Sequence, residues 1–252
     1  TLDGTAGVLT LAPGAVVVVV QGGTLVAEGS IANHGTLAVL GNGYYGIPAE
    51  LLLTGTVALS GGGLLSLADG SGAGAAGVPY QVVTGTDPST TLDNIDNLIS
   101  GFGELGNGQL TLANQGSGDI AATVGTLLVD TGANVIVNDG TMAGISGVLM
   151  LHGVIDATGG GTLAAFNSGI GAGTVLIDGA TVQGGTVVTD LTDRASLVTF
   201  SANGGTLDGT AAPVTLAPGA QVLIGASETV SVAGTFDLAR AGGLGGTLEV
   251  TG

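Results

Sequence analysis

Few side chains of this sequence could take part in catalysis, and one cluster brings three of them together. Asp190, Asp193 and Arg194 lie within a span of five residues and combine two carboxylates with a cation. Polysaccharide lyases, epimerases and hydrolases pair such carboxylates for acid–base work, beside cations that stabilise developing charge. The whole chain holds only 2 basic residues. We therefore expect this cluster to be a solvated corner with a local ion pair of little energetic weight, and not a catalytic site.

The other candidate residues fall into no catalytic or metal-binding pattern. His34 and His152 each precede a glycine, and neither has the His-x-x-x-His or Glu-x-x-His spacing of a metal site. The chain has no cysteine and no Gly-x-Ser-x-Gly elbow, which excludes thiol nucleophiles and that class of hydrolase. We expect both histidines to be exposed corner residues and the chain not to be an enzyme.

The aspartates raise the possibility that the chain binds calcium, but we expect no cofactor. The run Gly242-Gly-Leu-Gly-Gly-Thr-Leu-Glu-Val250 has the glycines of a calcium-binding nonapeptide repeat, but Gly stands where the ligand Asp belongs. No tandem copies follow it. The acidic charge is better explained as a source of solubility and of repulsion between neighbouring molecules.

Two surface features could meet a ligand. Tyr44 and Tyr45 form an aromatic pair that could stack on a sugar ring, although an ordinary loop anchor is the simpler interpretation. A flat threonine face could bind ice or another ordered surface, but Thr mostly stands singly at the start of apolar segments, as β-branched residues do in strands. A glycan or a host surface therefore remains a candidate partner without a defined site.

The charge balance excludes whole classes of partner. With 2 cationic and 19 acidic residues the net charge is −17, and the only cations are Arg194 and Arg240. Binding to nucleic acid or to an anionic lipid surface needs several basic residues. The longest apolar run, Ala15 to Val20, is far shorter than a membrane span. We expect a soluble chain with no nucleic-acid partner and no membrane insertion.

The elements that must position these residues are short strands. Apolar segments of alternating pattern, such as Thr36-Leu-Ala-Val-Leu40 and Thr126-Leu-Leu-Val129, recur along the chain and end at Gly, Asp-Gly or Asn-Gly. The chain contains 51 glycines and only 7 aromatic residues. A sandwich core needs larger side chains, whereas a narrow coil of stacked strands suits Val, Leu, Ile and Ala. The pattern predicts an all-β parallel β-helix, or β-solenoid, of right-handed coil.

The solenoid is expected to form one segment over residues 1–252. At about 20 residues per turn it would have about 12 turns and a length of about 60 Å. The Gly- and Ser-rich stretch at 70–91 breaks the pattern and predicts a loop or seam. The only place where we expect a short helical turn is Leu92 to Ser100.

A long repeat overlies the short strands. Residues 1–17 return as residues 206–222, with 13 of 17 positions identical, including both Thr-Leu-Asp-Gly-Thr-Ala and Thr-Leu-Ala-Pro-Gly-Ala. This agreement predicts that the two segments occupy equivalent positions on successive units. It also predicts that the chain is part of a larger, repetitive protein.

The run from Asp96 to Leu112, with Val129-Asp-Thr-Gly132 and Gly204-Gly-Thr-Leu-Asp-Gly209, resembles the β-strand repeats of very large secreted and surface proteins of Gram-negative bacteria, adhesin-like proteins among them. The resemblance covers residues 92–165 well and is one of general style elsewhere, and it is specific as to the type of protein but weak as to activity. It implies an exported, extracellular protein of repetitive β architecture, and it supplies no catalytic residue.

These observations together predict a non-enzymatic, extracellular structural module: a stalk, spacer or fibre of a bacterial surface adhesin or matrix protein. Self-association into fibres, or contact with neighbouring repeats, is the expected partnership. The alternative is a β-helical carbohydrate-active enzyme or sugar-binding module.

Overall fold

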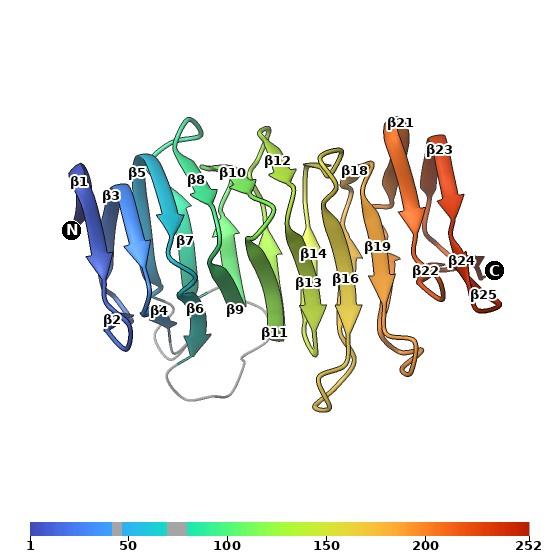
Figure 1. Cartoon of the computed structure of the whole chain (residues 1–252), viewed down its shortest axis with the longest axis horizontal. Coiled ribbons are helices and arrows are strands. Elements are labelled where there is room, and N and C mark those ends of the chain that lie inside the picture. Colours follow the sequence, from blue (N-terminus) through green and yellow to red (C-terminus); the bar gives the residue numbers. More distant parts are fainter. Residues whose placement is uncertain (42–46, 70–79, 252) are drawn as a thin grey trace.

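The chain is a single β-solenoid. The computed structural model describes residues 1–41, 47–69 and 80–251, and these contain strands and turns but no helix. Strands pair in parallel and stack as about ten turns along a rod, with the two termini at opposite ends (Figure 1). The prediction of an all-β solenoid of parallel stacked strands is confirmed. In the described residues the only antiparallel pairings are β24 with β25 and a bridge between Ser201 and Gly204.

Each turn runs through three faces, which we name A, B and C in chain order. Strands of nine to twelve residues bend at a corner and serve two faces: β1 (Leu2–Leu11), β3 (Thr24–Asn33) and β5 (Ala49–Ser60) on A and B, β9 (Leu98–Gly106) and β11 (Asp119–Val129) on C and A, and β21 (Gly205–Leu216) and β23 (Val230–Leu238) on B and C.

The shorter strands lie on one face each. Face A holds β7 (Gln81–Gly85), β14 (Val148–Leu151), β17 (Thr174–Ile177), β20 (Leu197–Phe200), β22 (Gln221–Ile224) and β26 (Thr247–Val250). Face B holds β8 (Thr91–Asn94), β10 (Thr111–Asn114), β12 (Val135–Asn138), β15 (Val154–Asp156) and β18 (Thr181–Gln183). Face C holds β2 (Val16–Val20), β4 (Thr36–Gly41), β6 (Leu64–Asp69), β13 (Thr141–Ile145), β16 (Thr162–Phe166) and β19 (Thr186–Thr189). The two-residue strands β24 (Arg240–Ala241) and β25 (Leu244–Gly245) form a small hairpin outside the faces.

The expected number of turns was too high because most turns use more residues than we expected. The pairing of Thr91 with Thr111 has the expected spacing. The pairing of Val148 with Thr174 spans a longer stretch of chain, and that of Leu64 with Leu98 a longer one still. Loops at the corners absorb the extra residues without adding strands. About ten turns at about 4.8 Å give a rod of about 48 Å.

The interior is a narrow column of aliphatic side chains. On face B, one position is filled on successive turns by residues that are each at most 1% exposed: Leu92, Leu112, Ile136, Ile155, Val182 and Leu207. Their neighbours in sequence point outward, as alternation in a strand requires. Burial of these side chains against the turns above and below supplies the stability of the coil.

The expected helical turn near Leu92 to Ser100 is wrong. Strand β8 covers the first part of this range and β9 the last. The apolar residues Leu92 and Ile99 point into the core from successive faces, and a tight corner with Asn94 and Asn97 joins the two strands. Each strand alternates apolar and polar residues, and the corner between the strands breaks this alternation. The apolar residues are therefore spaced in the sequence as they would be in a helix.

A ladder of buried asparagines lines the corner between faces B and C. Asn94, Asn114 and Asn138 share one register position on three successive turns and are 0% exposed. The Nδ2 of Asn94 donates to Oδ1 of Asn114 at 2.8 Å, and Nδ2 of Asn114 donates to Oδ1 of Asn138 at 2.8 Å. These amides also satisfy corner carbonyls, such as that of Gly118. The ladder fixes the register of the turns, because each amide needs a partner above or below.

The two copies of the long repeat have the same local geometry. Gly14 and Gly219 follow the shared prolines with φ of 78° and 79°. In each copy the strand register breaks at the same place, between Gly4 and Leu9 and between Gly209 and Val214. The copies lie on different faces, since Leu2 is on face A and Leu207 is on face B. On face A, each strand pairs with the strand one turn later, and eight such pairings lead from β1 to β20. Because β21 begins on the next face, one repeat covers eight full turns of the coil plus one face.

The predicted seam at 70–91 contains a strand. Residues 70–79 lie outside the described residues, but β7 at Gln81–Gly85 pairs with β5 on one side and β9 on the other. Face A therefore continues through this range. Among the described residues there is no helix with the length and apolar character of a membrane span.

Candidate functional site

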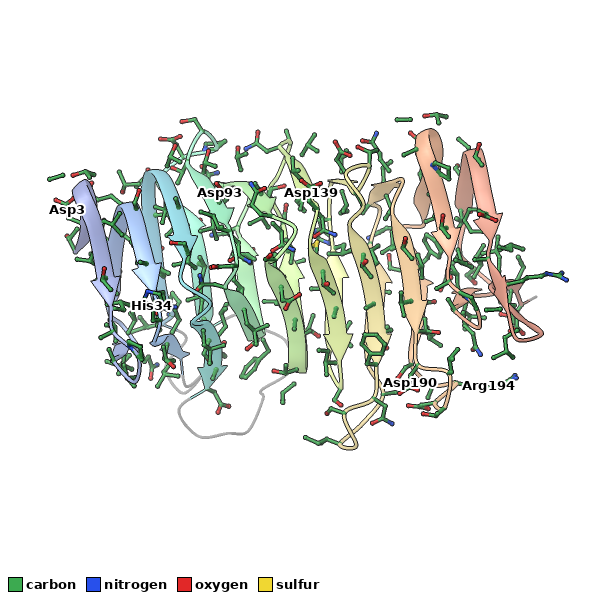
Figure 2. The ribbon with its side chains drawn as sticks, viewed as in Figure 1. Asp3, His34, Asp93, Asp139, Asp190 and Arg194 are labelled. Carbon is green, nitrogen blue, oxygen red and sulfur yellow. The ribbon has the colours of Figure 1, made fainter. Side chains whose placement is uncertain are left out.

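The predicted cluster of Asp190, Asp193 and Arg194 lies on the loop between β19 and β20. Figure 2 shows Asp190 and Arg194 at one edge of the rod. Oδ1 of Asp190 accepts hydrogen bonds from the backbone N and the hydroxyl of Thr192, at 2.8 and 2.7 Å. Oδ2 of Asp193 accepts from Nδ2 of Asn167 at 2.7 Å. Both carboxylates are thus acceptors that shape their own loop.

Hydrogen bonding holds both carboxylates in their ionised form. The side chain and backbone of Thr192 lower the pKa of Asp190 below its usual value. The backbone N–H of Ala195 and the side chain of Asn167 lower the pKa of Asp193, against the opposing effect of the Asp190 charge. A general acid needs a raised pKa. Neither residue meets that requirement in this arrangement.

The expected local ion pair is not formed. In the described residues, both contacts within 4.0 Å between a basic and an acidic side chain are made by His152, so Arg194 makes none with Asp190 or Asp193. Thr192 and Asn167 satisfy the carboxylates, and the exposed guanidinium of Arg194 extends into solvent. The second predicted candidate, the pair Tyr44 and Tyr45, lies outside the described residues.

The two histidines differ in their surroundings. His34 is an exposed corner residue after β3 (Figure 2). His152 belongs to a column of polar residues at the corner between faces A and B, where Asp130, His152, Asp178 and Ser201 follow the face-A strands of four successive turns. We name these four residues the corner stack. Each backbone N–H donates to the carbonyl one turn earlier, at 2.9 to 3.1 Å.

The imidazole of His152 lies between two carboxylates. Its Nε2 is 2.5 Å from Oδ2 of Asp178, and its Nδ1 is 3.5 Å from Oδ2 of Asp130. Ser201 Oγ and Asn203 Nδ2 both donate to Oδ1 of Asp178. Burial raises the pKa of Asp178, but the hydrogen bonds from Ser201, His152 and Asn203 outweigh it and leave the pKa below its usual value.

The geometry of the corner stack suits a structural role. A serine nucleophile needs its hydroxyl on the imidazole, whereas Ser201 donates to Asp178. Both oxygens of Asp178 are already occupied by hydrogen bonds. In the described part of the chain, no group of three His, Asp or Glu side chains is placed to hold a metal ion. The stack joins successive turns through charged hydrogen bonds on the outside of the coil.

Sequence reasoning missed the corner stack because its members come from different turns and form no local motif. Asp130 and His152 are 22 positions apart, and His152 and Asp178 are 26 apart. A signal was present nonetheless. Val129-Asp130, Leu151-His152 and Ile177-Asp178 each place a polar residue directly after a buried strand end. Aligning strands by their ends would have placed the three side chains in one column.

Glu104 faces outward from face A near the same corner, and its protonation is linked to stability. Burial raises the pKa of Glu104, and the charge of Asp130 raises it further, while His152 opposes the change. A raised pKa means that the folded state holds this proton more tightly than the unfolded state. The ionised carboxylate therefore costs stability above the folded-state pKa, and the cost vanishes below the unfolded-state value.

Glu104→Gln is accordingly expected to raise the melting temperature at pH 7, by roughly 1 to 3 °C. The advantage should disappear below about pH 4, where the wild-type carboxyl is protonated as well. Glu249→Gln is the matched control, because Glu249 occupies the same outward register position of face A on the exposed last turn. Thermal unfolding of the three proteins between pH 3 and 8 makes the comparison. A gain that does not depend on pH would contradict the assignment.

A shallow groove on face C has the chemistry to contact a single sugar ring. Its volume is about 170 Å³, and its lining includes Ser66, Asp69, Ser100, Phe102 and Thr123. Hydroxyls, a carboxylate and an aromatic ring are the groups that proteins use on sugars. The volume is below the roughly 300 Å³ at which ordinary ligand pockets begin.

Comparison of the chain with family models, with curated proteins and with solved structures found no match.

Proposed function

We propose that this chain is a non-enzymatic, extracellular structural module, a stalk, spacer or fibre segment of a bacterial surface adhesin or matrix protein. The observation that carries the proposal is the recurrence of residues 1–17 at 206–222, with the same corner geometry, inside one continuous coil. Repetition of this kind lengthens a rod without changing its cross-section. Length is the property that a stalk or a fibre needs.

The chemistry of the predicted site supports the same proposal. The carboxylates of Asp190 and Asp193 are ionised acceptors within one loop, and the lone guanidinium beside them pairs with neither. Breaking a glycosidic bond needs an acid with a raised pKa opposite a base or nucleophile.

The location outside the cell rests on the resemblance to secreted surface proteins. Immunolabelling of intact producer cells tests this location, because antibodies should bind without permeabilisation.

The second candidate is a sugar-binding module or carbohydrate-active enzyme, and the groove on face C is the observation in its favour. Its lining combines the hydroxyl residues Ser66, Ser100 and Thr123 with the aromatic residue Phe102. This arrangement would bind one sugar unit of a surface glycan. Such binding is compatible with a stalk, because a long repetitive rod can present many weak contacts whose avidity exceeds the affinity of each.

Purified protein is expected to show no turnover of pectin, alginate or chitin-type polymers. Depolymerisation and release of unsaturated or reducing ends are the measurements. The enzymatic alternative would stand if turnover appeared and was lost in Asp190→Ala or Asp193→Ala. Asp87→Ala is the matched control, because Asp87, like Asp190, accepts from the backbone N and hydroxyl of the residue two positions later, here Ser89. Loss of turnover in that variant as well would point to a general loop defect.

A further inference from the structure

The repeat shows one sequence in two situations. In the second copy, Leu207, Val214 and Leu216 are 1%, 0% and 0% exposed. Their counterparts in the first copy, Leu2, Leu9 and Leu11, are only partly buried, and Leu2 and Leu9 pack against the same core. Both copies are covered on the side toward the C-terminus, where Leu2 pairs with Ala27 and Leu207 with Val232. The copies differ on the other side.

The second copy owes its burial to the turn that comes before it. Val182 of β18 pairs with Leu207, and Val187 of β19 pairs with Leu216. The backbone N–H groups of Thr206, Thr215 and Ala217 donate to carbonyls of that turn, those of Ala180, Gly185 and Val187, each at 2.9 Å. The residues that correspond to Thr215 and Ala217 in the first copy are Thr10 and Ala12.

The first copy already has the conformation of the covered state. Thr5 donates to Oδ1 of Asp3 from its backbone N and its hydroxyl at 2.9 and 2.6 Å, and Thr210 donates to Asp208 at 3.0 and 2.7 Å. The Pro-Gly corners agree as well, as described above. Docking on this edge would therefore require little rearrangement, which removes much of the usual cost of binding.

We infer that the N-terminal edge, formed by β1 and β2, is the docking surface for a solenoid turn of the kind formed by residues 181–204, supplied by a second copy of the repeat joined in line. The inference rests on the proposed function and deepens it, because it names the surface through which units join. The counterpart of Val182 would lie on Leu2, and that of Val187 on Leu11. This interface would repeat the contact that β18 and β19 already make with β21.

Charge favours this occupant. The chain carries a net charge of −17, so contacts between copies must avoid setting carboxylates against one another. The strands β18 and β19 contain only Thr, Val and Gln. Asp208 lies opposite Gln183 in register, so Asp3, which stands at the N-terminal end of the rod (Figure 2), would meet an amide and not a second carboxylate.

Joining in line also sets the orientation of successive units. Because one repeat makes eight turns and one face, each unit would be rotated by one face relative to the last, and every feature would return to its starting face after three units. The groove on face C would then be presented in three directions along a fibre. A ligand on a flat surface could be reached whichever way the fibre lies.

The test adds the missing turn to the full chain. A duplicate of residues 180–205 is placed directly before Thr1, which reproduces the junction found at Thr206. We expect amide hydrogen exchange at Thr10 and Ala12 to slow by on the order of a hundredfold, because both N–H groups gain the carbonyl partners that Thr215 and Ala217 have. The control extension carries Val182→Asp and Val187→Asp in the duplicate only, and should leave exchange at the rate of the unextended chain.

Two results would overturn the inference. One is equal exchange at Thr10 and Ala12 in the extended and unextended chains while Thr215 and Ala217 remain protected, which shows that the rest of the coil is folded. The other is concentration-dependent protection of these amides in the unextended chain, which would make a separate molecule the occupant. Neither result bears on the polysaccharide assay or the surface labelling, so failure here is distinguishable from failure of the proposed function.

Discussion

Asn114→Asp is expected to lower the free energy of unfolding by about 3 to 5 kcal/mol. The side chain of Asn114 is 0% exposed, and its Nδ2 lies within hydrogen-bond distance of three acceptors: Oδ1 of Asn138 and the carbonyls of Gly118 and Thr141. An ionised carboxylate would place a buried negative charge against all three. The measurement is the shift of the urea unfolding midpoint at pH 7.

The same substitution on the surface provides the control. Asn107 is exposed at a turn with φ of 49°, a conformation that Asp also tolerates, so Asn107→Asp should change stability by no more than about 0.5 kcal/mol. The penalty at position 114 should also shrink below about pH 4, because protonation restores one donor. Equal midpoints for the two variants would mean that the asparagine ladder does not hold the turns in register.

The fold could be predicted because its cause is local. Thr126-Leu-Leu-Val129 places Leu127 and Val129 inward, and each such segment buries every second side chain in the same way. Gly and Asn at segment ends mark the corners. Few aromatic residues and frequent corners leave a narrow coil as the solution, so class and strand direction follow from residues close together in the chain.

The asparagine ladder and the corner stack could not be predicted by the same reasoning. Asn94 and Asn114 are 20 positions apart, whereas Asn114 and Asn138 are 24 apart, because the loops between them differ in length. Contacts between turns therefore have no fixed spacing, and an asparagine at the end of a strand looks like a turn residue alone. These loops also make most turns longer than about 20 residues, which is why the coil has fewer turns than we expected.

The loop of Asp190 shows where local reasoning is sufficient and where it is not. That these residues form a corner follows from their sequence, since an Asp followed two residues later by Thr favours a side-chain-capped turn. The sequence does not predict that Arg194 pairs with neither carboxylate. The contact that displaces it comes from Asn167 on the preceding turn, 26 positions away from Asp193.

Gly101→Ala is expected to cost about 3 kcal/mol or more, because it sets a side chain against the backbone of the neighbouring turn. Gly101 has a φ of 127°, and a Cβ there would lie 1.7 Å from the carbonyl oxygen of Leu67. The turn must then separate from its neighbour or the strand must unwind, and either change opens the column of aliphatic side chains beside it.

Gly171→Ala is the matched control, since a Cβ at Gly171 meets nothing within 4 Å and its φ is ordinary. That variant should match the wild type or gain a few tenths of a kcal/mol from a less flexible unfolded chain. Thermal unfolding of both proteins decides the matter: if Gly101→Ala melted with the control, the close stacking of β6 and β9 would not be a condition of the coil.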